Sequence, residues 1–277
     1  MTTRPLRLLP ALLLLCATGA SAQSTRTLTD DDWCDRTNDW SSWGDGGRYT
    51  ACEVRETVLS TDRLSVEGSN GGITVRPWDR SDVLVRARVA TRGRSQDEAD
   101  RRVRETDLDV GRGSVRAKTP RGRNVWVAVS YEVFAPARTA LALRTQNGGV
   151  SVEGMTGRLD AQTQNGGVAL RGVSGAVRAR TQNGGITVDL ARRSRAGLDL
   201  KTQNGGITVS VPDGYSANLT ASTRVGRIAT PGFDLPRERA ERGRYAVGDR
   251  VEARLGGGGP PLSVETTNGS ITIRRDR

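Results

Sequence analysis

The chain has 277 residues with 34 glycines and a formal net charge of +11, and only 4% of its residues are aromatic. It contains no histidine, which excludes every Ser-His-Asp arrangement and removes the commonest general base and the commonest zinc ligand. Few aromatic residues and many glycines favour short strands joined by frequent turns over a conventional globular core.

The N-terminal segment 1–22 has the pattern of a signal peptide. Two arginines precede an apolar run at 8–20, and the sequence ASA at 20–22 fits a cleavage site made of small side chains. The run is too short to span a bilayer, and the mature chain offers no other candidate span. Lipidation at Cys16 is the alternative, although three leucines precede that cysteine where small side chains are usual. We therefore expect a protein exported to the periplasm or the cell surface of a bacterium.

Residues 23–56 form a separate N-terminal segment, which holds the two cysteines left after cleavage, Cys34 and Cys52. An even number of cysteines in an oxidising compartment predicts a disulfide between them. A catalytic cysteine normally has a histidine partner, which this chain lacks.

The next part of the chain is predicted to hold irregularly spaced strands. An early strand–turn–strand copy lies at 64–78, and further strands are expected at 83–90, 107–110, 113–118 and 125–135.

One helix is predicted at 95–105. Ser95 and Glu98 match a capping box, and Ala99 and Val103 share its apolar side.

A repeated T-Q-N-G-G motif dominates residues 140–230. Its asparagines follow one another at an even spacing that lengthens only before the last copy, and pairs of apolar residues at i and i+2 recur at half that spacing. Alternation of this kind is strand periodicity. Two short strands per coil of about 18 residues, with glycine turns between them, predict an all-β solenoid, or β-helix. A meander of independent N-G hairpins is the competing architecture.

The repeated turn is first of all structural, because Asn and Gly tolerate a positive φ and permit a sharp reversal. Stacked coils would let side-chain amides hydrogen-bond along the axis as a ladder, formed by Asn147, Asn165, Asn183 and Asn204. The threonines of the motif would form a second column, and Gln182 should face water. A closing coil at 255–277 is expected to cap the stack, and Val225-Gly226 marks a degenerate copy.

The order of these motifs carries a family resemblance. A cysteine pair, NGGITVRPWD at 70–79, a short helix, YEV at 131–133, serial T-x-N-G-G coils and TNGSI at 267–271 follow one another. This order resembles the bacterial DUF4097 ("putative adhesin") family, a relative of head-GIN type β-solenoid domains. The resemblance covers residues 57–277, and it implies a β-solenoid domain with an adhesive role and no assigned catalytic residues.

Catalytic and metal-binding patterns are missing from the sequence. Enzymes on β-helix scaffolds cluster carboxylates on one face, but the acids of residues 140–230 repeat at no constant coil position: Glu153, Asp160, Asp189, Asp199 and Asp213. Calcium-binding repeats need an aspartate where these coils have Val, Leu or Thr, and the glycines at 256–259 lack the lysine of a phosphate loop. We expect no enzyme, no metal and no cofactor. A polysaccharide lyase or hydrolase is the alternative.

Arginine is the more informative residue. Residues 140–230 hold eleven basic residues against five acids. A basic face for anionic glycan, lipid headgroups or extracellular nucleic acid is predicted from Arg178, Arg180, Arg192, Arg193 and Arg195. No recognition helix or aromatic platform indicates sequence-specific binding of nucleic acid. The alternative is a solvated face that binds nothing.

These patterns predict an exported, non-enzymatic β-solenoid that serves as an adhesive, structural or scaffolding module of the cell envelope. Strand edges at the ends of such a stack would also permit self-association.

Overall fold

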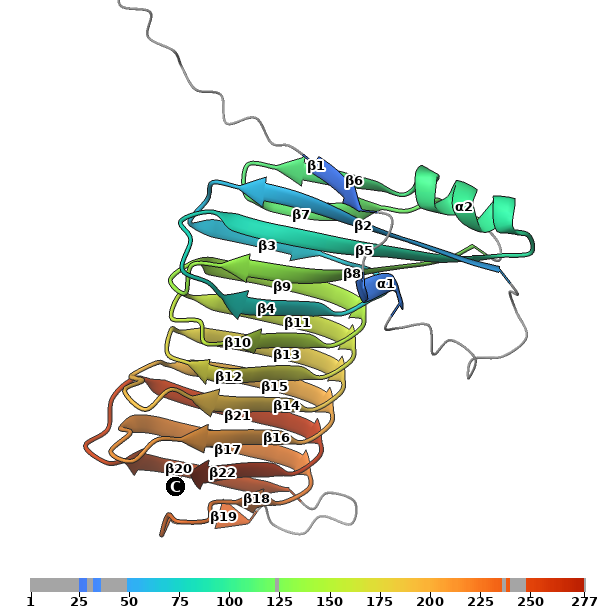
Figure 1. Ribbon diagram of the computed structural model, residues 1–277. Coiled ribbons are helices and arrows are strands. Elements are labelled where there is room, and N and C mark those ends of the chain that lie inside the picture. Colours follow the sequence, from blue (N-terminus) through green and yellow to red (C-terminus); the bar gives the residue numbers. More distant parts are fainter. Residues whose placement is uncertain are drawn as a thin grey trace, which may run out of the picture.

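The computed structural model describes residues 25–28, 32–35, 49–122, 125–235, 238–239 and 248–276. The signal peptide expected at 1–22 lies outside the described residues. Within them the chain folds into two 11-stranded sheets, here sheet A and sheet B, which face each other along one stack (Figure 1). Two helices, α1 (Asp32–Asp35) and α2 (Gln96–Glu105), lie at the end of the stack that holds the N-terminal strands. Neither described helix is long and apolar enough to cross a membrane.

Sheet A contains, in spatial order, β1 (Thr25–Leu28), β2 (Tyr49–Leu59), β5 (Val83–Gly93), β8 (Trp126–Ala135), β4 (Ile73–Pro77), β10 (Val150–Glu153), β12 (Val168–Val173), β14 (Ile186–Leu190), β16 (Ile207–Val211), β22 (Ile271–Arg275) and β18 (Ile228–Ala229).

Sheet B contains, in spatial order and starting from the same end, β6 (Asp107–Gly111), β7 (Ser114–Lys118), β3 (Arg63–Glu67), β9 (Ala140–Asn147), β11 (Leu159–Asn165), β13 (Val177–Asn183), β15 (Leu198–Asn204), β21 (Pro261–Asn268), β17 (Ala217–Val225), β20 (Asp249–Leu255) and β19 (Glu238–Arg239).

Each regular coil consists of a sheet B strand, an N-G-G turn and a sheet A strand. β11 pairs in parallel with β9 and β13, and β12 pairs in parallel with β10 and β14. The register joins equivalent residues, for example Leu159 with Val177 and Val168 with Ile186. Inward side chains alternate with outward ones and fill a core of mostly aliphatic residues between the sheets. The predicted β-solenoid is confirmed, and the parallel pairing rules out a meander of hairpins.

The predicted helix is also present. Ser95 accepts the backbone N–H of Glu98 at the start of α2, and Ala99 and Val103 are buried. The Glu98 carboxylate accepts the N–H of Arg94 instead of closing the box on Ser95, and this hydrogen bond lowers the pKa of Glu98.

Antiparallel strands close the N-terminal end of the stack. In sheet A, β8 is parallel to β4, but β5, β2 and β1 follow it in antiparallel order. In sheet B, β6 is antiparallel to β7. A disulfide joins Cys34 of α1 to Cys52 of β2, with 5.8 Å between their Cα atoms. Closing a loop of this length stabilises a fold by about 3 kcal/mol through the unfolded chain.

The last coil of the sequence lies inside the stack. β21 pairs in parallel with both β15 and β17, and β22 pairs with both β16 and β18 (Figure 1). The expectation that this coil caps the stack is therefore wrong. The degenerate coil with Val225-Gly226 is instead the outermost parallel coil. Val225 replaces the asparagine of the column there, and no further coil follows in the described part of the chain whose asparagine would bond to it. Antiparallel β20 covers that coil, and its Asp249 accepts the N–H of Ile228.

Close approach of the stacked backbones fixes the first glycine of each turn. A Cβ atom on Gly166 would lie 2.2 Å from the carbonyl oxygen of Gly148. The second glycine is less crowded, since a Cβ on Gly167 would meet its nearest atom at 3.3 Å. Ser270 and Arg227 occupy this second position in two coils. The first position is glycine in every coil: Gly71, Gly148, Gly166, Gly184, Gly205, Gly269 and Gly226.

A column of buried threonines runs beside these glycines. The Thr181 hydroxyl donates to the carbonyl oxygen of Gly166 in the neighbouring coil at 2.9 Å, and the other coils repeat this contact. Each threonine therefore satisfies a backbone acceptor that the ladder of strand hydrogen bonds leaves open.

The asparagines form an outer, solvent-exposed column. Asn183 donates to Asn165 at 2.8 Å and accepts from Asn204 at 2.9 Å. The same contacts extend the column past Asn147 to Asn70 and past Asn204 to Asn268.

We predict opposite tolerances for the two glycines of one turn. Gly166→Ala should destabilise the fold by about 3 kcal/mol, because neither backbone can move away from the new methyl group. Gly167→Ala should change the free energy of unfolding by less than about 1 kcal/mol. Urea unfolding of both variants checks this, and equal losses would contradict the close-approach argument.

A second series separates the columns. Thr181→Val should cost about 1–3 kcal/mol, because the Gly166 carbonyl loses its hydroxyl partner. Asn183→Ala should cost about 0.5–1 kcal/mol, a smaller loss because water can replace the exposed amide. Gln182→Ala, on an exposed residue outside both columns, should be close to neutral. Thermal melts of the three variants test this order, and a neutral Asn183→Ala would show that the asparagine ladder adds no stability.

Candidate functional site

The outer face of sheet B carries its polar side chains in rows along the stack. The strand register places Arg144, Gln162 and Arg180 in one row, and neighbouring members of a row are about 4.8 Å apart. A second row, next to the asparagine column, consists of exposed amides: Gln146, Gln164, Gln182 and Gln203.

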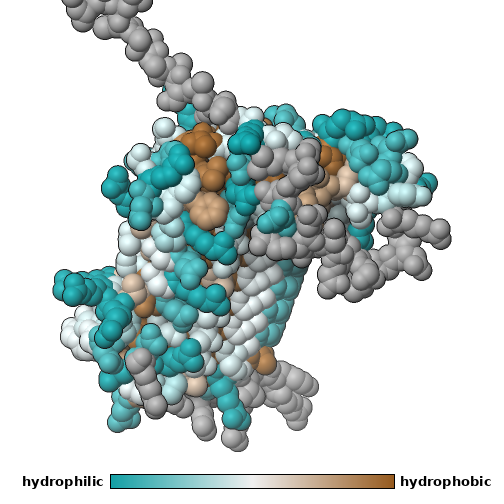
Figure 2. Space-filling model, in the orientation of Figure 1, coloured by the Kyte–Doolittle hydropathy of each residue, from teal (hydrophilic) through white to brown (hydrophobic). Residues whose placement is uncertain are grey.

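Polar groups dominate the surface elsewhere too. Figure 2 shows hydrophilic or pale side chains over most of the visible surface, while hydrophobic areas are small. The face in view therefore offers mainly hydrogen-bonding and charged groups to solvent.

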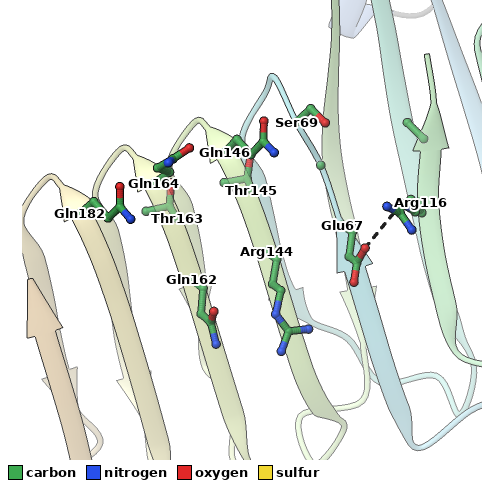
Figure 3. A pocket seen from close by; sticks show the side chains of 12 residues that line it. Glu67, Ser69, Arg116, Arg144, Thr145, Gln146, Gln162, Thr163, Gln164 and Gln182 are labelled. Carbon is green, nitrogen blue, oxygen red and sulfur yellow. Dashed lines mark ion pairs between the residues drawn. The ribbon is translucent and has the colours of Figure 1, made fainter. Parts of the chain in front are cut away.

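The first hollow on sheet B has a volume of 380 Å³ and lies over β7, β3, β9 and β11 (Figure 3). Arg144 and Gln162 extend across it from neighbouring strands, and the glutamine row lies along its edge by the turns. Arg116 and Glu67 bound the other side as an ion pair of 3.5 Å. The hollow is wide, shallow and lined by donors and acceptors.

Two further hollows continue from the first. The second, of 420 Å³, shares Gln162 and Gln182 with it, and the third, of 630 Å³, shares Arg180 and Lys201 with the second. We call the three together the sheet B trough. It runs from β7 to β21, which at the spacing of β-strands is about 29 Å.

Basic residues outnumber acids in the trough. It is lined by six cations, Arg116, Arg144, Arg158, Arg178, Arg180 and Lys201, and by three carboxylates, Glu67, Asp199 and Glu265.

Arg178 and Arg180 share one partner in the trough, Asp199, at 3.1 and 3.0 Å. Arg144 and Arg158 form no ion pair with any residue that the structure describes. Exposed ion pairs contribute only about 0–1 kcal/mol each, so the paired cations too can exchange their partner for an anionic ligand.

The loop 191–197 forms a separate basic hollow of 520 Å³, which we call the loop hollow. This loop carries the insertion by which the sequence separation of stacked asparagines rises from 18 to 21. Arg192, Arg193 and Arg195 line the hollow opposite Asp213, and none of the three has an ion-pair partner among the described residues. The loop hollow and the trough adjoin, since Pro260 lines both.

A buried tyrosine anchors this loop. The Tyr215 hydroxyl donates to the carbonyl oxygen of Ala196 at 2.6 Å, and burial raises the pKa of Tyr215 to about 12. The Ser194 hydroxyl accepts the N–H of Ala196 and holds the same turn. The arginines therefore project from a fixed loop backbone.

The aspartates of this face are separated by an arginine and bonded to neighbouring side chains. Asp160 and Asp199 occupy the same position of their coils, so the expectation that no coil position repeats an acid is wrong, but Arg178 lies in register between them. Asp160 accepts a hydrogen bond from Gln162 at 2.9 Å. Among the described residues no group of three potential metal ligands comes together. The guanidinium and amide groups of this face can donate hydrogen bonds to anions and hydroxyl groups.

The five arginines singled out from the sequence thus fall into two adjoining places. Arg178 and Arg180 line the trough, whereas the other three line the loop hollow. Sequence reasoning missed Arg144, Arg158 and the glutamine row as lining residues. The glutamines could have been found from the sequence, since one follows the threonine in each regular turn. Only the strand register shows that they share one surface with Arg144 and Arg158.

Comparison with known proteins places the chain in a family. A family model described as Toastrack DUF4097 matches residues 55–274, well over half of the chain. A comparison with curated proteins gives no match.

Several solved structures are similar to this chain at low identity. A "putative cell adhesion protein" from Clostridium sporogenes is 10% identical with a TM-score of 0.40, covering 80% of this chain and 100% of its own. A "putative adhesin" from Bacteroides fragilis is 10% identical with a TM-score of 0.31, covering 80% and 97%. One from Parabacteroides distasonis is 8% identical with a TM-score of 0.29, covering 80% and 97%.

The raised pKa of Tyr215 predicts an alkaline loss of stability. The unfolded tyrosine ionises near pH 10 and the folded one near pH 12, so its contribution is complete below pH 10 and is lost as the pH rises to 12. Tyr215→Phe should weaken the fold by about 1 kcal/mol at pH 8. Between pH 8 and pH 11.5 the free energy of unfolding of the variant should also fall by about 2 kcal/mol less than that of the unmodified protein. Urea midpoints at both pH values measure this, and identical pH profiles would contradict it.

Proposed function

Because the chain belongs to the Toastrack DUF4097 family, we propose that it is a binding module of the bacterial cell envelope and not an enzyme. In this proposal the mature chain begins after a signal peptide at 1–22. The cysteine segment 23–56 and the solenoid 57–277 then act together as an exported adhesive or scaffolding protein. The disulfide supports export, since such bonds persist in oxidising compartments.

The proposed ligand is an anionic envelope polymer that lies along the sheet B trough. The observation that carries this proposal is the continuity of the trough over seven strands, with amides and guanidinium groups repeating at the strand spacing. An extended polymer presents hydroxyl and acidic groups at regular intervals, and such groups match rows of donors better than one deep pocket does.

Charge sets the strength of this interaction. Arg144, Arg158 and the loop arginines offer guanidinium groups that form bidentate contacts with carboxylate or phosphate. All of them are exposed, so each contact is weak and the binding is reversible. The separation of the trough carboxylates by cations supports a role without bond cleavage.

We predict salt-dependent binding of the mature chain to an acidic polysaccharide such as polygalacturonate, or to vesicles containing phosphatidylglycerol. Binding should fade between 0.1 M and 1 M salt, because the Debye length shrinks from about 10 Å to about 3 Å. The triple variant Arg144→Ser, Arg158→Ser, Arg180→Ser should weaken binding roughly tenfold at 0.1 M salt. The variant Arg192→Ser, Arg193→Ser, Arg195→Ser tests the loop hollow in the same way.

A matched control removes the same charge from the other face. Arg76, Arg171 and Arg274 are exposed on sheet A, and their replacement by serine should change binding less than twofold if the trough is the site. If the trough and control variants lost the same affinity, binding would depend on net charge alone and the trough would not be the site. Salt-insensitive binding of a neutral glycan, or release of shorter fragments from any polymer, would overturn the proposal.

A further inference from the structure

The C-terminal coil, residues 261–275 with β21 and β22, is inserted between two coils that precede it in the sequence. We call the space between β15–β16 and β17–β18 the slot. The chain passes from β16 to β17 before it returns as β21 and β22, so the segment in the slot is later in the sequence than both coils that it separates. The C-terminal coil thus separates two coils that follow each other directly in the sequence.

The side-chain contacts of the threonine and asparagine columns continue through the coil in the slot. On one side Thr266 donates to the carbonyl oxygen of Gly205 and Asn268 to the side chain of Asn204. On the other side Thr223 donates to the carbonyl oxygen of Gly269. These are the same contacts that any two coils make, so the slot accepts a coil by its sequence pattern and is indifferent to which copy supplies it.

The linker allows the coil to leave. Residues 256–259 are four glycines, and three of them have a left-handed φ of 55°, 77° and 153°. The linker joins β20 to β21, which lie on opposite sides of β17, since Leu255 pairs with Ala217 and Pro261 with Asn218. The distance across β17 is two strand spacings, about 10 Å. Six extended residues reach about 20 Å. The coil can therefore move out of the slot while β20 remains paired.

Release of the coil costs less than its two interfaces suggest. The flanking coils carry the same columns, with Thr202 and Thr223 both aligned on Thr266 and Gly205 and Gly226 on either side of Gly269. When the coil leaves, these neighbours can close on each other in register, so that two interfaces are lost and one forms. In a repeat protein the stability is close to a sum of such nearest-neighbour terms.

We propose that the C-terminal coil is exchanged between two copies of this chain, each filling the slot of the other. A released coil exposes the edges of two strands that need hydrogen-bond partners. A second copy that has released its own coil, before its flanking coils close on each other, offers the matching slot, and reciprocal exchange restores every repeat contact in trans. Domain swapping of this kind joins two copies without a new interface.

Cross-linking tests the exchange directly. Lys201 and Glu265 are register partners across the slot and form an ion pair of 2.8 Å on the outer face. Lys201→Cys and Glu265→Cys are prepared as separate full-length variants, mixed at high concentration near the onset of melting, cooled and oxidised. Exchange yields a covalent dimer linked from position 201 of one copy to 265 of the other, identified by peptide mass mapping.

A control pair uses two coils that are adjacent in the sequence. Gln162 and Arg180 are equivalent register partners on β11 and β13, but neither belongs to an exchangeable coil. A mixture of Gln162→Cys and Arg180→Cys should give at least tenfold less of the crossed link. A 201–265 link no more abundant than the control link, at any protein concentration, would overturn the proposal. Light scattering must also show a dimer whose share grows with concentration, and a purely monomeric chain contradicts the exchange.

Discussion

The architecture depends on the contact between stacked glycine backbones. A side chain at Gly166 or its equivalents would overlap a carbonyl oxygen of the neighbouring coil, so the coils can approach this closely only where a Cβ is absent. This closeness brings the Thr181 hydroxyl within reach of the Gly166 carbonyl and keeps the asparagine amides at hydrogen-bonding distance. A shift of one residue would place threonine or asparagine where only glycine fits, and it would turn the apolar residues outward. One steric requirement thus fixes the register, the two polar columns and the direction of every side chain.

The same register turns outward positions into rows and forms the surface to which we assign binding. Arg144, Gln162 and Arg180 belong to different repeats, yet they share one row because their coils stack without offset. No single coil contains a site, and no deep pocket develops on the described part of so flat a sheet. Under the proposed function, specificity would arise from the order of amides and charges along the stack, and it would favour ligands that are themselves extended and repetitive.

The sequence was most informative where one repeat governs both pattern and packing. The even spacing of the asparagines predicted the coils, and the N-G-G turns predicted the column that those asparagines form, because local spacing determines both. It misplaced the closing coil, since a T-N-G-S turn stacks equally well at the end of the array or inside it. The local pattern does not say whether the C-terminal coil lies inside the stack or at its end. That place depends on which coil β20 and Asp249 cover. The arginines show the same division: alternation predicted that Arg178 points outward, but its partner Asp199 comes from the next coil.

The position of the C-terminal coil links the trough to the proposed exchange. Glu265 lines the trough and pairs with Lys201 across the slot boundary, so a polymer lying along the trough contacts residues on both sides of that boundary. In the swapped dimer each trough is completed by the partner copy, and the two troughs are held by the same pair of exchanged coils. A polymer long enough to reach both would bind the second at a high effective concentration, which raises avidity without any new contact. By mass action such a polymer would favour the dimer, because only that state offers two troughs at a fixed separation. The proposed weak contacts and the proposed exchange of the coil are therefore compatible within one β-solenoid.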